Sequence, residues 1–211
     1  KNAKTSPEGF RKIQRLIQIA NKFSLPLITL IDTSGPKLGI DSEERGLANT
    51  IATTISEMVN LQAPSISVII GEGGSEAALP LLVTNKTFML QNSILSVVSP
   101  EGAAEVIFQD SKRAKDIAGA LKITAIDCYQ LGIIDKIVLE PSGGAHNNAD
   151  DAARILSREL IKEISMVQSF SKRKLISDRQ KRFRNVGEYS SYFKQAIYKE
   201  VGFLKALVKG S

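Results

Sequence analysis

The stretch ISVIIGEGGSEAAL, residues 66–79, carries the pattern that decides the fold. Its first five residues form an apolar run that is typical of a buried strand. Glycines dominate the loop at residues 71–75, and a short helix is expected from Glu76 to about residue 83. A strand that runs through a glycine-rich loop into a helix is the unit from which parallel α/β sheets are built.

Strand, loop and helix alternate in the same way along most of the chain. The other expected strands are residues 26–31, 87–90, 94–98 and 133–139, which are short and mainly apolar. Helices are expected after Ser6-Pro7, from residue 41, after Ser99-Pro100, after Thr124 and over residues 149–170. This alternation predicts an α/β fold of parallel strands covered by helices. No strand precedes the first helix, so we expect a preceding segment or a partner to complete the sheet beneath it.

The composition is that of a soluble globular protein, with 43% hydrophobic and 24% charged residues. No apolar run approaches the ~20 residues that cross a bilayer, and the first eight residues lack the apolar centre of a signal peptide. The single cysteine, Cys128, and single histidine, His146, exclude an intrachain disulfide and a self-contained four-ligand zinc site. We expect no membrane partner and a location in the cytoplasm or in a plastid.

The net charge of +6 is concentrated in residues 171–184, where seven basic residues accompany one acid, Asp178. We interpret this stretch as a solvated helical face that docks on an acidic partner, because no aromatic or glycine pattern of a nucleic-acid module accompanies it. Replacing Arg179, Lys181 and Arg182 is expected to alter salt-dependent association and to spare turnover. With a final helix over residues 189–208, the stretch forms an expected C-terminal extension, 171–211, beside a main domain, 1–170.

Three loops are candidate site elements because ligands bind beyond the carboxyl ends of parallel strands. The loop at 71–75 opens a helix whose free N–H groups can hold a phosphate or stabilise an oxyanion. The alternative is a tight turn that only packs helix against strand, and the pattern does not separate the two. The other two loops supply the residues Asp32, Thr33, Ser34, Gly35, Ser99, Pro100, Glu101 and Gly102.

Side-chain catalysts are less evident in this sequence. A triad of Ser75, His146 and an acid can be drawn, but no spacing favours it, and we interpret His146 as a surface or capping residue. Cys128 lies among apolar neighbours and is expected in the core. Acid–base pairs can be drawn from Asp32, Glu72, Glu76, Glu101 and Glu105, although carboxylates near helix starts mostly act as caps.

Several longer motifs occur in a fixed order. They are PEGFRKIQRLIQIANKFSLPLITLIDTSG (7–35), EERG (43–46), VIIGEGGSEAAL (68–79), SVVSPEGAAEVIF (96–108), LGIIDKIVLEPSGGAH (131–146) and DRQKRFRNVGEY (178–189). Together they resemble the alpha subunits of bacterial acetyl-CoA carboxylase carboxyltransferases over nearly the whole chain. Residues 123–138 are also similar to the wider crotonase superfamily.

The resemblance implies a crotonase-type spiral of βαβ units and an active site shared with a beta subunit, or a fused beta domain, that bears a zinc ribbon. It implies that this chain binds carboxybiotin delivered by a biotin carboxyl carrier protein, and that the beta side binds acetyl-CoA or a related acyl-CoA. The product would be malonyl-CoA for fatty acid biosynthesis, and the assembly a hetero-oligomer with no metal in this chain. The implied backbone oxyanion hole for biotin comprises Gly73, Gly74, Ser75, Glu76, Ala77 and Ala78.

The sequence departs from this family in two loops. The family usually has glycines where Glu76 and Ala77 stand, so the added Cβ atoms are expected to crowd the ligand or to oppose a positive φ. Ser34 and Lys37 replace a proline and a tyrosine in the other loop. Two alternatives stay open: a stand-alone crotonase-type hydratase or isomerase that uses Glu76 or Glu101, and a non-catalytic structural subunit. Replacing Gly74 by valine is expected to abolish carboxyl transfer in a protein that still folds.

Overall fold

The centre of the structure is a sheet with the strand order β1-β2-β3-β5. The computed structural model describes residues 3–186. Its strands are β1 (Leu27–Thr33), β2 (Ser65–Gly74), β3 (Lys86–Leu90), β4 (Ile94–Ser96) and β5 (Lys136–Val138). All of these pairings are parallel, and β4 extends the sheet by pairing with residues 72–74 of β2. The expected parallel α/β architecture is confirmed.

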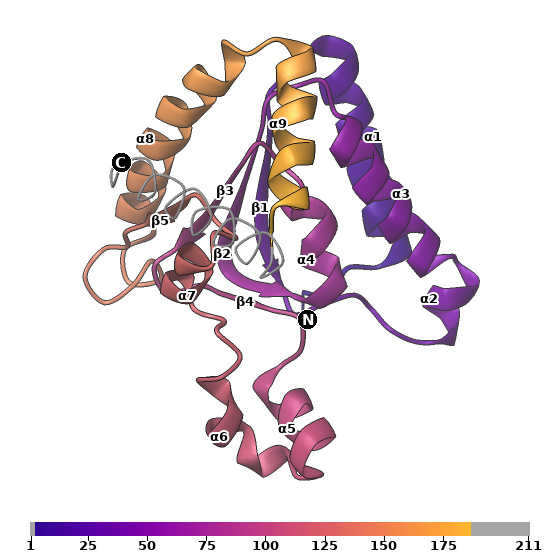
Figure 1. Ribbon diagram of the computed structural model, residues 1–211, viewed down its shortest axis with the longest axis vertical. Coiled ribbons are helices and arrows are strands. Elements are labelled where there is room, and N and C mark those ends of the chain that lie inside the picture. The colour runs from indigo at the N-terminus through magenta and orange to yellow at the C-terminus, as the bar shows by residue number, and fades with distance from the viewer. Residues whose placement is uncertain (1–2, 187–211) are drawn as a thin grey trace, which may run out of the picture.

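Helices cover this sheet on both faces (Figure 1). They are α1 (Pro7–Phe23), α2 (Ile40–Glu44), α3 (Leu47–Asn60), α4 (Ser75–Leu82), α5 (Pro100–Phe108), α6 (Ala114–Ala118), α7 (Ala125–Gln130), α8 (Ala149–Gln168) and α9 (Lys172–Arg184). Apolar side chains of α8 pack on one face against Val68 and Phe88 of the central strands. On the other face α4 and α7 pack against Ile69 and Met89. The helices α1 and α3 pack together beside α4.

The expected helix starts are confirmed by their capping contacts. The hydroxyl oxygen of Ser6 accepts the Gly9 N–H, and that of Ser99 accepts the Gly102 N–H. Thr124 forms a capping box with Asp127 at the start of α7. Each cap satisfies an N–H group that the helix itself leaves unpaired.

Several element boundaries differ from the sequence-based expectations. The helix expected from residue 41 is interrupted after α2, because Gly46 adopts a left-handed conformation with φ of 74° before α3 begins. The glycine-rich segment expected to be a loop is extended, and β2 continues to Gly74 because residues 72–74 pair with β4. β1 likewise continues to Thr33, which pairs with Gly73. The turn from strand to helix is therefore confined to Gly74 and Ser75.

The basic helix α9 is anchored in the core by a buried arginine. Arg179 has no exposed surface, and burial lowers its pKa to about 10. Its Nη1 donates to the carbonyl oxygens of Met58, Val59 and Leu61 at 2.8, 3.1 and 2.8 Å. Its Nη2 donates to the side chains of Ser65 and Asn85 at 3.2 and 2.8 Å. These contacts tie α9 to the end of α3 and to the amino end of the sheet.

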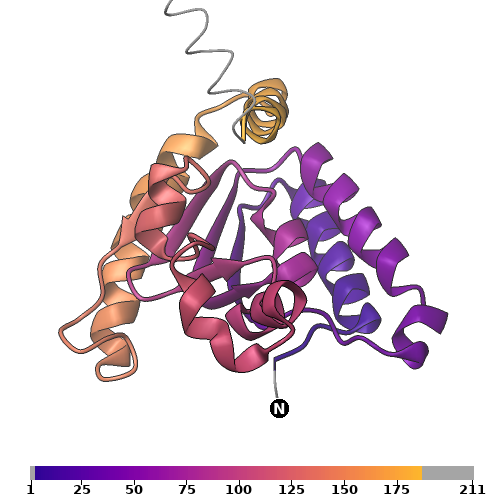
Figure 2. The same ribbon diagram turned by 60° about the horizontal axis from the view of Figure 1, so that its bottom comes forward.

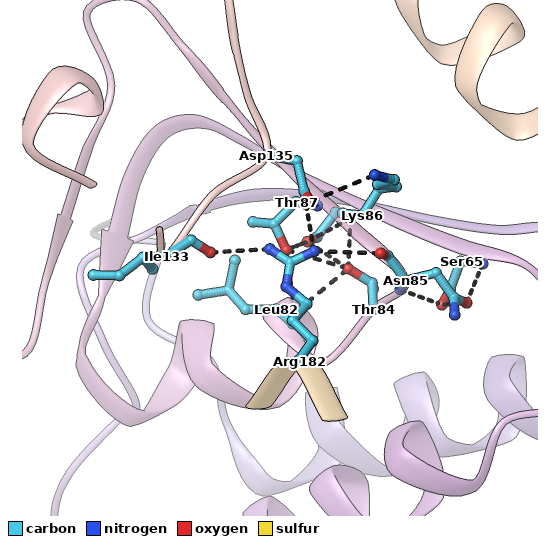
Figure 3. A network of polar contacts seen from close by, with 10 residues as sticks. Ser65, Leu82, Thr84, Asn85, Lys86, Thr87, Ile133, Asp135 and Arg182 are labelled. Carbon is cyan, nitrogen blue, oxygen red and sulfur yellow. Dashed lines mark hydrogen bonds and ion pairs between the residues drawn. The ribbon is translucent and has the colours of Figure 1, made fainter. Parts of the chain in front are cut away.

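A second arginine of α9 continues this anchorage (Figure 3). Arg182 donates to the carbonyl oxygens of Asn85 and Ile133 at 3.3 and 3.0 Å, and it forms an ion pair with Asp135. Asp135 also accepts the Thr87 N–H at 2.7 Å. The prediction that the basic stretch is a solvated face is therefore wrong for Arg179 and Arg182, since interior oxygens need these cations. The exposed Lys181 fits that prediction.

The two ends of the structure differ in how they are covered. Seen together, Figures 1 and 2 place α9 at one end of the sheet and the pair α5 and α6 at the other. Apolar side chains remain uncovered on α5, at Val106 and Ile107, and on the edge strand β1, at Ile28 and Leu30.

Within residues 3–186, no helix has the length and apolar character that a membrane span needs. The helix expected at 189–208 lies outside the described residues, and the boundary after residue 170 stays a prediction.

Candidate functional site

The ends of β1 and β2 approach each other too closely for any residue but glycine at position 74. A Cβ atom on Gly74 would lie 2.4 Å from the carbonyl carbon of Ser34 and 2.6 Å from the carbonyl oxygen of Thr33. Both neighbours are backbone atoms and cannot rotate away. Because of this contact, the Gly74→Val test expected to spare folding is unsuitable, since the larger side chain would separate the two strands.

The candidate residues Asp32, Thr33 and Gly35 shape the loop that packs against Gly74. A carboxylate oxygen of Asp32 accepts the Glu72 N–H at 3.0 Å. The Thr33 hydroxyl accepts the Gly35 N–H at 3.2 Å and donates to the carbonyl oxygen of Ala3 at 2.7 Å. The structure thus brings the predicted residues 32–35 and 73–75 together. The side chains of Asp32 and Thr33 bind backbone groups of both segments' surroundings, namely those of Glu72, Gly35 and Ala3.

Ser75 makes the turn from β2 into α4 in a left-handed conformation, with φ of 52°. For a residue with a side chain this conformation is strained, and such strain often occurs at functional sites. The Ser75 hydroxyl donates to the carboxylate of Glu76. Neither Glu76, Ala77 nor Ala78 has a positive φ, so the expected conflict between their side chains and the backbone does not arise there.

The first turn of α4 directs its backbone N–H groups at the carboxyl end of the sheet. Among the described residues, no side chain caps this helix, whose N-cap is Gly74. The side chains of Ala77 and Ala78 are fully buried in two core clusters, the first with Phe10 and Leu47. Of these three side chains at 76–78, that of Glu76 alone is exposed. Free N–H groups and the positive end of the helix dipole make this turn suited to bind an anionic oxygen.

An apolar cavity of about 570 Å³ opens beside this helix start and runs between α4 and α7. Ser75 and Glu76 lie at its polar end, Leu79 and Leu82 of α4 form one wall, and Cys128 and Leu131 of α7 form the opposite wall. We refer to this cavity as the α4–α7 groove. Sequence analysis missed it, because its walls come from helices about fifty residues apart and no local pattern joins them.

The third set of predicted residues, Ser99, Pro100, Glu101 and Gly102, begins α5 beside the groove and does not line it. The Ser99 hydroxyl is used as the cap of α5. The set follows Ser96 by three residues, and Ser96 pairs with Gly74 across the β2–β4 ladder. The structure therefore places this set at the margin of the candidate site.

His146 lies apart from Ser75 in a separate polar cavity of about 500 Å³, lined also by Gln91, Asn92 and Glu140. Burial raises the pKa of the Glu140 carboxyl group, but hydrogen bonds from the Asn92 and Ala145 amides outweigh burial and hold the pKa below its usual value. No triad of Ser75 and His146 is assembled. Over residues 3–186, no group of three or more His, Cys, Asp or Glu side chains could hold a metal ion.

Cys128 is 1% exposed, which confirms the expected core position. Burial, with a smaller contribution from Asp127, raises the pKa of its thiol to about 11. The sulfur is therefore an unreactive part of the groove wall at neutral pH.

The sequence has curated relatives of high similarity. It is 45% identical over 183 residues to the acetyl-coenzyme A carboxylase carboxyl transferase subunit alpha of Staphylococcus aureus, which covers 87% of this chain and 58% of that protein. It is also 45% identical to the subunit of the same name from Zymomonas mobilis, over 86% of this chain and 58% of that protein. The chain thus spans a little under three fifths of the length of the curated relatives it matches.

Solved structures with the same fold are more distant in sequence. A Pseudomonas malonate decarboxylase MdcD-MdcE hetero-dimer matches with a TM-score of 0.73 at 12% identity, over 93% of this chain and 78% of that one. Transcarboxylase 12S matches with a TM-score of 0.66 at 18% identity, over 78% of this chain and 31% of that one. The model of the acetyl co-enzyme A carboxylase carboxyltransferase-like family matches residues 2–187. The chain therefore belongs to the acetyl co-enzyme A carboxylase carboxyltransferase-like family.

Proposed function

We propose that this chain forms the half of a biotin-dependent acyl-CoA carboxyltransferase that receives carboxybiotin. The observation that carries the proposal is the start of α4, where no side chain within residues 3–186 caps the helix and an apolar groove opens alongside. Carboxybiotin, when bound, would supply the carboxyl group that is transferred to acetyl-CoA or a related acyl-CoA. The polar end and the apolar walls of the groove match a ligand that has a polar ring and an aliphatic arm.

The chemical work of this chain would be done by its backbone. The N–H groups of Glu76 and Ala77, with that of Ala78, would donate to the negative charge that develops on the ureido oxygen. Gly74 lets β1 and β2 approach each other and so sets the position of this turn. Removing one donor of this kind typically costs ~100- to 1,000-fold in rate. No side-chain nucleophile is needed, which agrees with the separation of Ser75 from His146.

The partners are part of the same proposal. A beta subunit or fused beta domain with a zinc ribbon would hold the acyl-CoA, and a biotin carboxyl carrier protein would deliver the biotin. The uncovered apolar side chains of β1 and α5 support a partner, because such side chains are stabilised when an interface removes them from water. We expect one complex when the chain is sedimented with its beta partner. A stable monomer that ignores this partner would contradict the hetero-oligomer.

A second candidate is suggested by the position of one carboxylate. Glu76 lies at the polar end of an apolar groove, beside the same helix start. That arrangement also suits a stand-alone crotonase-type hydratase or isomerase in which Glu76 moves a proton and the groove holds an acyl chain. If the protein is a hydratase or isomerase, the carboxylate of Glu76 is required for turnover. If it is a carboxyltransferase, only the backbone N–H of Glu76 acts.

Replacing Glu76 separates the two candidates. In the complete complex, Glu76→Gly should match or exceed the unchanged chain in transfer of carboxyl from carboxybiotin to acetyl-CoA, since it keeps the N–H and removes a negative charge. Glu72→Gln is a matched control, because Glu72 lies four residues earlier, in β2, and its N–H is held by Asp32. Loss of turnover in both Glu76→Gly and Glu76→Gln, but not in the control, would favour the hydratase reading. A complex that transfers no carboxyl in any form would favour a structural subunit.

A further inference from the structure

The α4–α7 groove has two charged residues of opposite sign among its apolar walls. Of the described residues that line it, Glu76 is the single acid and Lys122 is the single cation. The proposed function uses the backbone N–H of Glu76 and gives Lys122 no role. A cation beside apolar walls is suited to bind an anionic group on a ligand whose body is largely apolar.

The pairing of β4 places Lys122 close to the start of α4. On one side of β4 the N–H of Leu95 donates to the carbonyl oxygen of Ile123 at 2.9 Å. On the other side β4 pairs with β2, where Ser96 lies opposite Gly74. Neighbouring strands lie ~4.8 Å apart, so the backbone at Lys122 is about 10 Å from Gly74. The flexible four-carbon stem of a lysine can cover much of this distance.

The backbone of Lys122 adopts a left-handed conformation, with φ of 51°. This conformation is unfavourable for a residue that carries a Cβ atom, whereas glycine adopts it readily. Such strained residues are concentrated at binding sites and active sites. The local backbone would favour glycine at this position, so the reason for a lysine must lie in its side chain.

The ammonium group of Lys122 takes part in one exposed ion pair. Its Nζ lies 3.6 Å from Oδ1 of Asp127, and 61% of the lysine side chain is exposed. The other carboxylate oxygen of Asp127 accepts the N–H and the hydroxyl of Thr124 in the capping box of α7. Exposed pairs of this kind contribute little stability, so the carboxylate of a ligand can replace or join Asp127 as the partner of Lys122.

We propose that the ammonium group of Lys122 binds the carboxylate of carboxybiotin while the first N–H groups of α4 bind the ureido oxygen. This inference rests on the proposed function and adds to it a side chain that recognises the carboxylated form of the ligand. The carboxylate is the group by which carboxybiotin differs from biotin. Lys122 therefore gives the chain a preference for the carboxylated carrier over the uncarboxylated one.

Binding of the carrier in the absence of acyl-CoA measures this preference, because no carboxyl group is then transferred. In the complete complex, Lys122→Gln should weaken binding of the carboxylated biotin carrier by ~10-fold, as expected when one charge-assisted hydrogen bond is lost. Binding of the uncarboxylated carrier should not change. Lys122→Arg keeps a cation and should restore most of the affinity. Lys115→Gln is the matched control, since Lys115 is an exposed lysine of α6 that does not line the groove. If Lys122→Gln weakens binding of both carrier forms equally, or of neither, the proposal is overturned.

A further variant separates ligand binding from folding. Lys122→Gly removes the strain of the left-handed conformation, so it should leave the melting temperature unchanged or raise it. It should still weaken binding of the carboxylated carrier as much as Lys122→Gln does. A lower melting temperature with equal loss of both carrier forms would show a structural role for Lys122 and overturn the proposal. Failure of the proposed function itself gives a different result, because the unchanged complex would then bind neither carrier form and transfer no carboxyl group.

Discussion

Charged side chains of opposite sign bind backbone groups at the two edges of the parallel sheet, although Asp135 at the amino edge also accepts the Thr87 N–H. At the amino edge, where α3 ends, the cationic Arg179 binds carbonyl oxygens. At the carboxyl edge, where helices begin, the carboxylates of Asp32 and Glu140 accept backbone N–H groups. At the amino edge the helix dipole favours this arrangement, because its negative end lies where α3 ends. At the carboxyl edge the accepted N–H groups belong to β2 and to turns.

The start of α4 departs from this rule in a way that is informative. It lies at the carboxyl edge, and among the described residues no side chain caps its N–H groups, although Ser6, Ser99 and Thr124 cap other helices. The carboxylate of Glu76, in the first turn of α4, is exposed and accepts from the Ser75 hydroxyl. At the amino edge, side chains of the protein therefore bind the backbone carbonyl groups at the end of α3. At the carboxyl edge, the first N–H groups of α4 stay available to bind a ligand.

The largest effect is expected at the carboxyl edge, from Gly74→Ala. The added Cβ atom would meet the backbone of Ser34, directly after β1, at 2.4 Å, so we expect a loss of roughly 3 kcal/mol in the free energy of unfolding. In the proposed carboxyltransferase complex, turnover should fall by ~100-fold or more, because the first turn of α4 would shift. Gly119→Ala is the control, since nothing lies within 4 Å of its added Cβ atom. Chemical denaturation and turnover would measure both effects, and equal results for the two variants would contradict the close approach at Gly74.

A comparable loss of stability without a direct effect on chemistry is expected at the amino edge. Arg179→Met leaves the three carbonyl oxygens and the Asn85 side chain without their donor, at a cost of roughly 3 kcal/mol after relief of the buried charge. Arg179→Lys should not restore stability, since a lysine cannot reproduce the planar fork of donors. Lys172→Met, on an exposed position of the same helix, should change the free energy of unfolding by less than ~0.5 kcal/mol. Thermal melting would measure the stability of all three variants. Equal melting temperatures would contradict the buried role of Arg179.

The smallest effect is expected from Glu140, and it depends on pH. Its folded pKa lies below the usual value of 4.5, so its contribution is fully present above pH 4.5 and is lost as the pH falls through the folded pKa. Glu140→Gln should lower the free energy of unfolding by roughly 1 kcal/mol at neutral pH, and by less as the solution becomes acidic. Glu105→Gln, on the exposed face of α5, is the control. A constant difference between Glu140→Gln and the unchanged protein from neutral pH down to pH 3 would contradict the carboxylate's role.

Much of the fold could be predicted because its signals are local. Three helices begin directly after the cap residues from which they were predicted, Ser6, Ser99 and Thr124. The mainly apolar segment before Gly71 likewise predicted the central strand. The loop boundaries were less accurate, since the extended state of residues 72–74 is imposed by pairing with β4 and not by the glycines themselves. Likewise, a basic stretch looks solvated in sequence, because nothing within it shows that Arg179 faces carbonyl oxygens about 120 residues earlier.

The sequence by itself determined the parallel α/β class, the helix caps and the glycine-rich approach to α4, since each depends on residues a few positions apart. Only the tertiary structure decided that Gly74 must lack a side chain, that Ala77 and Ala78 point into the core while Glu76 points out, and that an apolar groove joins α4 to α7. The physical reason is that packing, close approach and the pairing of buried charge depend on distances between segments far apart in the chain. Such distances exist only once the whole sheet has assembled.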